Sequence, residues 1–113
     1  PLRVVDDEVG SPTYAPDAAA AIRQLADLGL PGVYHVVNEG FCSRYELAVA
    51  ALRIAGVAAP IEAIKSGEFR RDSTPPPFSP LHNGAAAALG VTLRPWQSAL
   101  GEFVAAMDQE AAA

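Results

Sequence analysis

The sequence predicts an α/β fold in which three short strands alternate with about four helices around an incomplete sheet. Short apolar or β-branched runs recur between segments whose apolar residues are spaced three and four positions apart. Glycine or proline stands near most boundaries between these segments. The last third of the chain carries mostly helical patterns, so too few strands remain for an ordinary sheet. We therefore expect a piece of a larger domain.

The first strand is expected at 2–6, where two consecutive valines favour an extended backbone. A loop follows over 7–12, and the next two residues stay extended up to the helix that follows. Pro16 suits the first turn of that helix, and Asp17 complements the positive end of its dipole. About three helical turns are expected before Gly29 ends the helix.

The second strand is expected at 33–37, an apolar run typical of a strand covered on both faces. A capping box then begins the second helix: Ser43 accepts a hydrogen bond from the backbone three residues on, and Glu46 returns one. Gly56 is placed to end this helix in the left-handed conformation.

The third strand is expected at 61–64, and the segment 65–80 is expected to be irregular because it holds four prolines. Asn83 is expected to cap a short helix over 85–89. Pro95 opens the last helix. One face of this helix collects large apolar side chains, which we interpret as core: Trp96, Leu100, Phe103, Val104 and Met107.

Composition excludes several functional classes. The chain has 113 residues, with 8 Lys plus Arg against 13 Asp plus Glu, which gives a net charge of −5. Nucleic-acid binding needs clustered basic residues, and the seven arginines are scattered except for the pair Arg70-Arg71. No apolar run is long enough for a membrane span, and no signal peptide is recognisable.

The single cysteine, Cys42, allows neither an internal disulfide nor a Cys-pair zinc site, so we expect a reducing, cytoplasmic compartment. We interpret Cys42 as a buried partner of Leu47 in a hydrophobic staple. The chain starts with Pro1, without an initiator methionine, directly before a strand. We therefore expect the chain to be a piece cut from a longer protein.

Three blocks of sequence carry a resemblance to a known family. The first is V-V-D-D-E-V-G-S-P-T-Y-A-P-D at 4–17, and the second is G-V-Y-H-V-V-N-E-G at 32–40, followed by S-R-Y-E-L-A at 43–48. The third consists of S-P-L-H-N at 79–83 with L-R-P-W at 93–96. The blocks follow one another in the order typical of dTDP-4-dehydrorhamnose reductases, which are extended short-chain dehydrogenases. The chain resembles about the last third of that family.

The resemblance implies reduction of dTDP-4-dehydro-6-deoxy-L-mannose to dTDP-L-rhamnose. In the family a Rossmann portion binds NADPH or NADH and carries a Tyr-x-x-x-Lys pair, while the C-terminal part shapes the sugar-nucleotide cleft. A divalent metal in the full-length enzyme is left open. This sequence has no glycine-rich phosphate loop and no Tyr-x-x-x-Lys. We therefore expect 1–113 to be a single C-terminal substrate-binding portion that lacks the NAD(P)-binding domain and is inactive alone.

The resemblance also suggests candidate substrate-binding residues. Ser11, Pro12 and Thr13 are expected to line the cleft; the alternative is a loop that only caps the following helix. Arg70 and Arg71 lie in a proline-rich loop, and a guanidinium fork fits a diphosphate. The alternative for this pair is solvation beside the neighbouring carboxylates.

Two departures from the family pattern affect the substrate assignment. The usual Asp-Gln appears as Asp7-Glu8, which exchanges an amide for a charge, and the usual Arg-Pro appears as Pro75-Pro76. An arginine in the latter place is an obvious diphosphate ligand, for which Arg70 or Arg71 is the candidate substitute. A reductase of another nucleotide-linked deoxysugar is therefore a second hypothesis.

Other polar residues favour structural roles. His35 is interpreted as a satisfied core or sheet histidine and His82 as part of a turn. The carboxylates at 6–8 favour a solvated turn over a metal site, because consecutive side chains point in different directions.

Two further functional hypotheses stay open. One is a non-catalytic binding or regulatory relative of the same superfamily, and the other is a free-standing interaction module. We also expect exposed apolar surface, which favours association with the missing N-terminal portion or a homo-oligomer.

Overall fold

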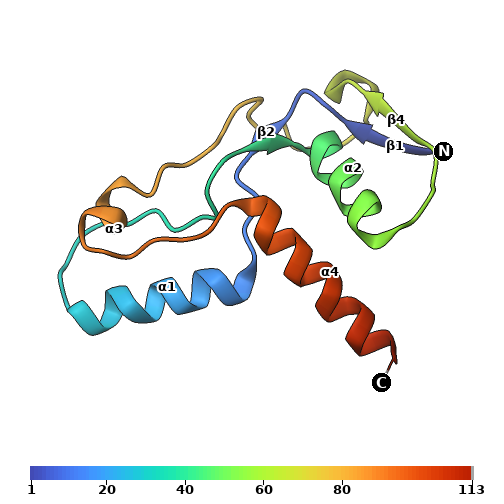
Figure 1. The fold of residues 1–113 in the computed structure, drawn as a ribbon. Coiled ribbons are helices and arrows are strands. Elements are labelled where there is room, and N and C mark those ends of the chain that lie inside the picture. The colour runs from blue at the N-terminus through green and yellow to red at the C-terminus, as the bar shows by residue number, and fades with distance from the viewer. Residues whose placement is uncertain (113) are drawn as a thin grey trace.

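Two groups of elements lie on either side of the start of the last helix (Figure 1). In the computed structural model, which describes residues 1–112, the first group holds strands β1 (Leu2–Val5) and β4 (Ile61–Ile64) with helix α2 (Arg44–Ala55). The strands pair in parallel with Leu2 opposite Ile61. The second group holds helices α1 (Ala15–Leu28) and α3 (Gly84–Ala88). Helix α4 (Trp96–Ala112) begins between the groups and contacts α2.

A small three-stranded arrangement lies beside the first group. Strands β2 (Val9–Gly10) and β3 (Cys42–Ser43) pair antiparallel. The segment 77–79 adds to the other edge of β2: the Val9 amide donates to the Pro77 carbonyl at 2.9 Å, and the Ser79 amide donates to the Val9 carbonyl at 2.9 Å. A single 3₁₀ turn, η1 (Ser66–Glu68), precedes residues 69–80, which hold four prolines and are called the proline-rich segment below. The strands β2 and β3 have two residues each, which is too short to show an alternating apolar pattern, so the sequence analysis did not predict them.

Within the described residues 1–112, four helices with short strands confirm the predicted α/β class. The strands expected at 2–6 and 61–64 form, and the capping box of α2 is complete: Ser43 Oγ accepts from the Glu46 amide at 3.0 Å, and Glu46 Oε1 accepts from the Ser43 amide at 3.1 Å. Gly56 ends α2 with φ at 69°, in the left-handed region. These features depend on local chemistry that a sequence reveals directly.

We expect Ser43→Ala to lower the free energy of unfolding by about 1 kcal/mol, because the Glu46 amide loses its acceptor at the start of α2. Urea unfolding measures this loss. Ser98→Ala, at an exposed position of α4, is the matched control and should leave stability unchanged or slightly raised. Equal effects of the two substitutions would contradict the role of the cap.

The strand expected at 33–37 is wrong. The segment has no regular structure, and Val33 is 85 % exposed. The side chain of Asn83 takes the place of a neighbouring strand at Val37, because its Oδ1 accepts from the Val37 amide at 2.9 Å and its Nδ2 donates to the Val37 carbonyl at 2.6 Å. An apolar run predicts burial, whereas a strand also needs a backbone partner. Asn83 is the N-cap residue of α3, as expected, but its side chain is engaged at Val37 and makes no capping hydrogen bond.

The expected core face of α4 is correct only in part. Trp96 and Val104 are buried and Leu100 is half-buried, but Phe103 and Met107 are about half exposed. Many of the buried apolar side chains among residues 1–112 form two small clusters. One joins α1 to the segment around α3, and the other joins Cys42, an alanine of α2 and Trp96. Leu47 packs on the second cluster, as the predicted staple requires.

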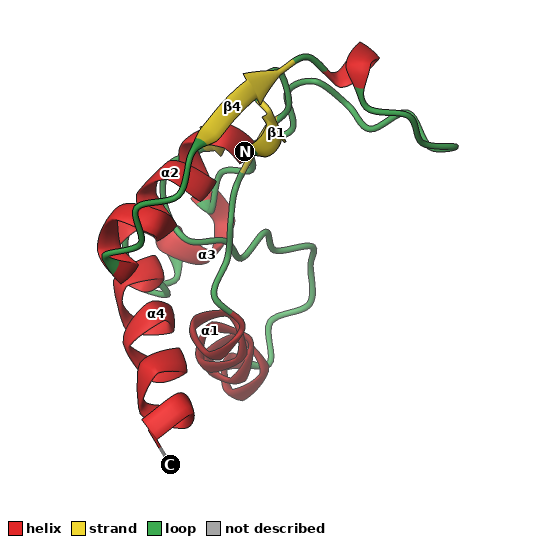
Figure 2. Ribbon diagram, turned by 90° about the vertical axis from the view of Figure 1, so that its right-hand side faces the viewer, coloured by secondary structure: helices red, strands yellow, loops and turns green. Residues whose placement is uncertain are grey.

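The molecule is flat and open. Its radius of gyration is 16.2 Å, whereas a compact domain of this length has roughly 13 Å. Figure 2 shows that the loop after β4, which contains η1, extends away from the labelled helices. Many large apolar side chains are exposed, as the sequence predicted. None of the helices among residues 1–112 is long and apolar enough to cross a bilayer.

A buried polar network holds α1 against the start of α4. Asn38 is completely buried; its Oδ1 accepts from the Tyr14 amide at 2.7 Å, and its Nδ2 donates to Asp17 Oδ2 at 2.8 Å and to the Arg94 carbonyl at 3.2 Å. The Arg94 guanidinium donates to both oxygens of Asp17, at 2.8 and 3.1 Å, and pairs with Glu102. Three segments distant in sequence therefore meet at one carboxylate.

Acid should weaken this network. The Arg94 guanidinium holds the pKa of Asp17 below its usual value of 3.8; burial opposes this shift, and a smaller contribution from the Asn38 side chain adds to it. A lowered folded-state pKa contributes stability that is fully present above about pH 4 and is lost as the pH falls through the folded value. Asp17→Asn should therefore flatten the acid limb of a stability-against-pH curve. Asp27→Asn, on the exposed side of α1, is the control, and identical acid limbs for wild type and Asp17→Asn would contradict the prediction.

Candidate functional site

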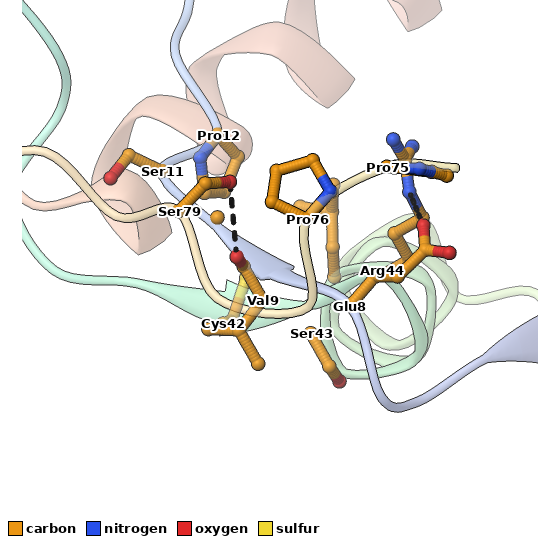
Figure 3. A pocket seen from close by; sticks show the side chains of 12 residues that line it. Glu8, Val9, Ser11, Pro12, Cys42, Ser43, Arg44, Pro75, Pro76 and Ser79 are labelled. Carbon is orange, nitrogen blue, oxygen red and sulfur yellow. Dashed lines mark hydrogen bonds and ion pairs between the residues drawn. The ribbon is translucent and has the colours of Figure 1, made fainter. Parts of the chain in front are cut away.

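A pocket whose lining includes the charged side chains of Glu8 and Arg44, called the polar pocket below, lies where β2, β3 and the proline-rich segment meet the first turn of α2. Its volume is about 310 Å³. Figure 3 shows Ser11, Pro12 and Ser79 at one end and Glu8 and Arg44 near Pro75 at the other. Cys42 and Ser43 form part of the wall, together with the remaining lining residues, which are Val9, Gly10, Leu47 and Pro76. Because all of these elements hydrogen-bond to β2 or pack beside it, the two-residue strand organises the pocket.

One buried carboxylate dominates the electrostatics of this pocket. Glu8 is only 6 % exposed, and it pairs with Arg44, whose Nε lies 3.2 Å from Glu8 Oε1, and with Arg71 through Oε2. A buried carboxylate is stable only when it is paired in this way. The solvated turn expected at 6–8 is therefore wrong for Glu8. Asp7 instead accepts from the Ser66 amide at 2.9 Å and its hydroxyl at 3.1 Å.

The structure brings together only part of the predicted substrate-binding set. Ser11 and Pro12 line the pocket. Thr13 does not, and its hydroxyl donates to the Ser11 carbonyl at 3.0 Å. The Ser11 hydroxyl accepts from the Leu81 amide at 2.9 Å, which ties this loop to the segment that follows the prolines. The loop thus has a structural role beside its place in the pocket wall, and its contact with substrate stays a prediction.

Arg70 and Arg71 stand outside the pocket lining. The Arg71 side chain is 26 % exposed and pairs with Glu8 rather than with the carboxylates next to it in sequence. Its guanidinium lies 5.5 Å from the centre of the Phe69 ring. Arg70 is exposed. Their assignment to substrate also stays a prediction.

Sequence reasoning missed the charged residues that do line the pocket. The sequence analysis treated Arg44 only as the residue after Ser43 in the capping box, and it treated Glu8 as part of a solvated turn and as a departure from the family pattern. Two departures from the family pattern, taken together, could have drawn attention to these residues: a carboxylate replaces an amide at position 8, and an arginine is missing at position 75. A gain and a loss of charge near one site suggest that another residue compensates.

A larger apolar pocket adjoins the first and shares Pro12, Arg44 and Leu47 with it. Its volume is about 680 Å³, and it lies between β1, the start of α1, α2 and α4. Its wall includes Trp96 and Phe103, and Thr13 belongs to this pocket. Half-exposed Phe103 therefore faces a cavity rather than a packed core.

The other candidate residues show no catalytic arrangement. Burial raises the pKa of the Cys42 thiol to about 11, with a smaller contribution from Glu46, which leaves it protonated and unreactive at neutral pH. His35 is exposed, so its expected place in a core or sheet is wrong, and His82 is exposed as well. Residues 1–112 contain no cluster of three or more potential metal ligands.

The described chain does not fit a dinucleotide cofactor by itself. Such a cofactor needs a glycine-rich turn between a strand and a helix, where backbone amides approach the pyrophosphate. Here β1 leads instead into Asp6, Asp7 and Glu8 and then directly into β2, so no glycine-rich turn joins a strand to a helix at this point. A nicotinamide cofactor would therefore depend on residues outside this chain.

Comparison with known proteins shows that the fold is that of a substrate-binding domain family. A family model described as RmlD substrate binding domain matches residues 1–109. The chain belongs to this family. The dTDP-4-dehydrorhamnose reductase of Mycobacterium tuberculosis is 41 % identical over 106 residues, which cover 91 % of this chain and 35 % of that protein. The dTDP-4-keto-6-deoxy-D-glucose reductase of Streptomyces niveus is 34 % identical over 104 residues, covering 86 % and 34 %.

A solved structure shares the fold. The dTDP-4-dehydrorhamnose reductase of Bacillus anthracis, crystallised in complex with NADP, superimposes with a TM-score of 0.85 at 31 % identity, and the match covers 90 % of this chain and 37 % of that one. The chain thus spans about a third of the length of the relatives it matches and aligns to their C-terminal part. The family predicted from the three sequence blocks is confirmed.

Proposed function

We propose that this chain is the substrate-binding portion of an NAD(P)H-dependent reductase that converts dTDP-4-dehydro-6-deoxy-L-mannose into dTDP-L-rhamnose. The family match over residues 1–109 is the observation that carries the proposal. The polar pocket supports it, because its lining includes Ser11 and Pro12 of the family's first sequence block together with one cationic side chain, that of Arg44. The chain alone is inactive in this proposal, since it lacks a Tyr-x-x-x-Lys pair and a cofactor loop.

The partner in this proposal is an N-terminal NAD(P)-binding Rossmann portion of the same protein. The flat shape of the chain and its exposed apolar side chains support such a partner, because isolated domains seldom leave this much apolar surface uncovered. A homo-oligomer and a cytoplasmic location stay predictions.

The test is an assay of the intact protein that carries this chain. With NADPH and the dTDP-linked 4-keto sugar, we expect oxidation of NADPH and formation of dTDP-L-rhamnose, identified by mass spectrometry and NMR. The 113-residue chain should show no turnover under the same conditions. An intact protein that binds dTDP but leaves NADPH unoxidised would instead support the non-catalytic relative.

A reductase of another nucleotide-linked deoxysugar is the second candidate. Its support is the Streptomyces niveus relative, whose name gives a different 4-keto sugar, together with the proline at position 75. Competition between the two 4-keto sugars in one assay separates the candidates, because the preferred substrate has the higher kcat/KM.

A further inference from the structure

We propose that Arg44 is the anion-binding residue of the polar pocket and takes a phosphate group of the nucleotide-linked substrate. The proposal rests on the proposed function and deepens it, since it assigns the contact that recognises the charged part of the ligand. Arg44 is the only cationic side chain among the residues that line the pocket.

The geometry leaves the outer part of the Arg44 guanidinium free. Its Nε is held by Glu8 at 3.2 Å, and this is its only ion pair among residues 1–112. The side chain is 65 % exposed, so its two terminal amino groups remain available as donors. Figure 3 shows the paired side chains near Pro75 at one end of the pocket. A planar guanidinium with free terminal donors matches the geometry of a phosphate.

The local charge is positive although the chain as a whole is acidic. Glu8 carries one negative charge and is paired with two guanidiniums, Arg44 and Arg71, so the triad has a net charge of +1. Of the two nearest carboxylates in sequence, Asp6 is neutralised by Lys65 at 2.8 Å, whereas Asp7 keeps its charge but accepts from Ser66 and does not line the pocket. Among the lining residues and their ion-pair partners, positive charge exceeds negative charge by one.

The remaining polar groups of the pocket, apart from Glu8, are uncharged; the serine hydroxyls of the pocket already make internal hydrogen bonds, although those of Ser11 and Ser43 keep a proton to donate. The Ser11 hydroxyl accepts from the Leu81 amide, the Ser43 hydroxyl accepts from the Glu46 amide, and the Ser79 hydroxyl donates weakly to the Val9 carbonyl at 3.4 Å. Discrimination between a charged and an uncharged ligand must then come from Arg44. Because Glu8 is buried and doubly paired, it keeps the guanidinium at the pocket wall before a ligand arrives.

The experiment is calorimetric titration of the intact protein with dTDP, thymidine and inorganic diphosphate. We expect the wild type to bind dTDP more tightly than either of the other two probes. Arg44→Gln should weaken dTDP about tenfold or more and leave thymidine unchanged, because only the charge-assisted bonds are lost. Arg44→Lys should retain part of the affinity. The fold should survive both changes, since Glu8 keeps Arg71, and unfolding midpoints verify this.

Arg53→Gln is the matched control, since Arg53 lies exposed in the last turn of α2 and outside the pocket; its affinity for dTDP should equal that of the wild type. Affinity of Arg44→Gln for dTDP within twofold of the wild type would overturn this inference while leaving the proposed function standing. Inorganic diphosphate binding as tightly as dTDP would overturn the assignment to a nucleotide. A wild-type protein that binds neither dTDP nor thymidine would overturn the proposed function as well.

Discussion

Replacement of Asn38 by alanine is expected to lower the free energy of unfolding by about 4 kcal/mol. The side chain is completely buried and makes three hydrogen bonds, to the Tyr14 amide, to Asp17 and to the Arg94 carbonyl. Alanine removes all three and leaves a backbone donor and a backbone acceptor without their partner. Since these groups lie on three separate segments, α1 should also lose its orientation to α4.

Asn38→Asp should be worse than Asn38→Ala at neutral pH, although it changes the volume far less. Its carboxylate would face the Asp17 carboxylate at the position where the Asn38 Nδ2 donates at 2.8 Å, and like charges at that distance repel strongly. Stability should recover partly in acid, as one of the two carboxylates becomes protonated. Local chemistry, not volume, therefore sets the cost at this position.

Urea unfolding of the chain, followed by the fluorescence of Trp96, its only tryptophan, measures both changes. Gln24→Ala, exposed on α1, is the control and should shift the midpoint by no more than a few tenths of a kcal/mol. A loss below about 1 kcal/mol for Asn38→Ala would show that water replaces the amide at low cost, and the network would not be a centre of stability.

Elements that rest on local chemistry were predictable, and those that rest on distant partners were not. The capping box at Ser43 and the left-handed glycines at the ends of α1 and α2 follow from residues within a few positions of one another. The strand expected at 33–37 failed because a strand needs a neighbour, and here the neighbour at Val37 is a side-chain amide 46 positions away. No periodicity encodes such a contact.

The same distinction between local and distant contacts explains which parts of the candidate site were predictable. The loop with Ser11 and Pro12 was predicted from one continuous sequence block, and the structure does place it in the pocket wall. The charged triad joins positions 8, 44 and 71, which belong to three segments far apart in sequence. The sequence shows where each arginine and glutamate stands, but only the fold shows which of them form ion pairs.

Replacement of Glu8 by alanine is expected to lower the free energy of unfolding by about 2–3 kcal/mol and to release the proline-rich segment. The cost should stay below that of breaking a fully buried pair, because Arg44 is 65 % exposed and Arg71 is 26 % exposed, so both guanidiniums can regain water. Glu8→Gln should have an intermediate effect: an amide oxygen accepts from one guanidinium, while the amide NH₂ faces the donors of the other.

Trypsin provides the sharper measurement, because it cleaves after arginine and Arg71 is held by Glu8. Release of this side chain should raise the rate of cleavage after Arg71 about tenfold or more in Glu8→Ala, since cleavage follows the population of the opened segment. Glu62→Ala, exposed on β4, is the matched control and should cleave like the wild type. If cleavage after Arg71 is equally fast in the wild type and in Glu8→Ala, the segment is held by its backbone bonds to β2 alone. The pocket would then keep its wall without the triad, and the charge of Glu8 would serve only to position Arg44.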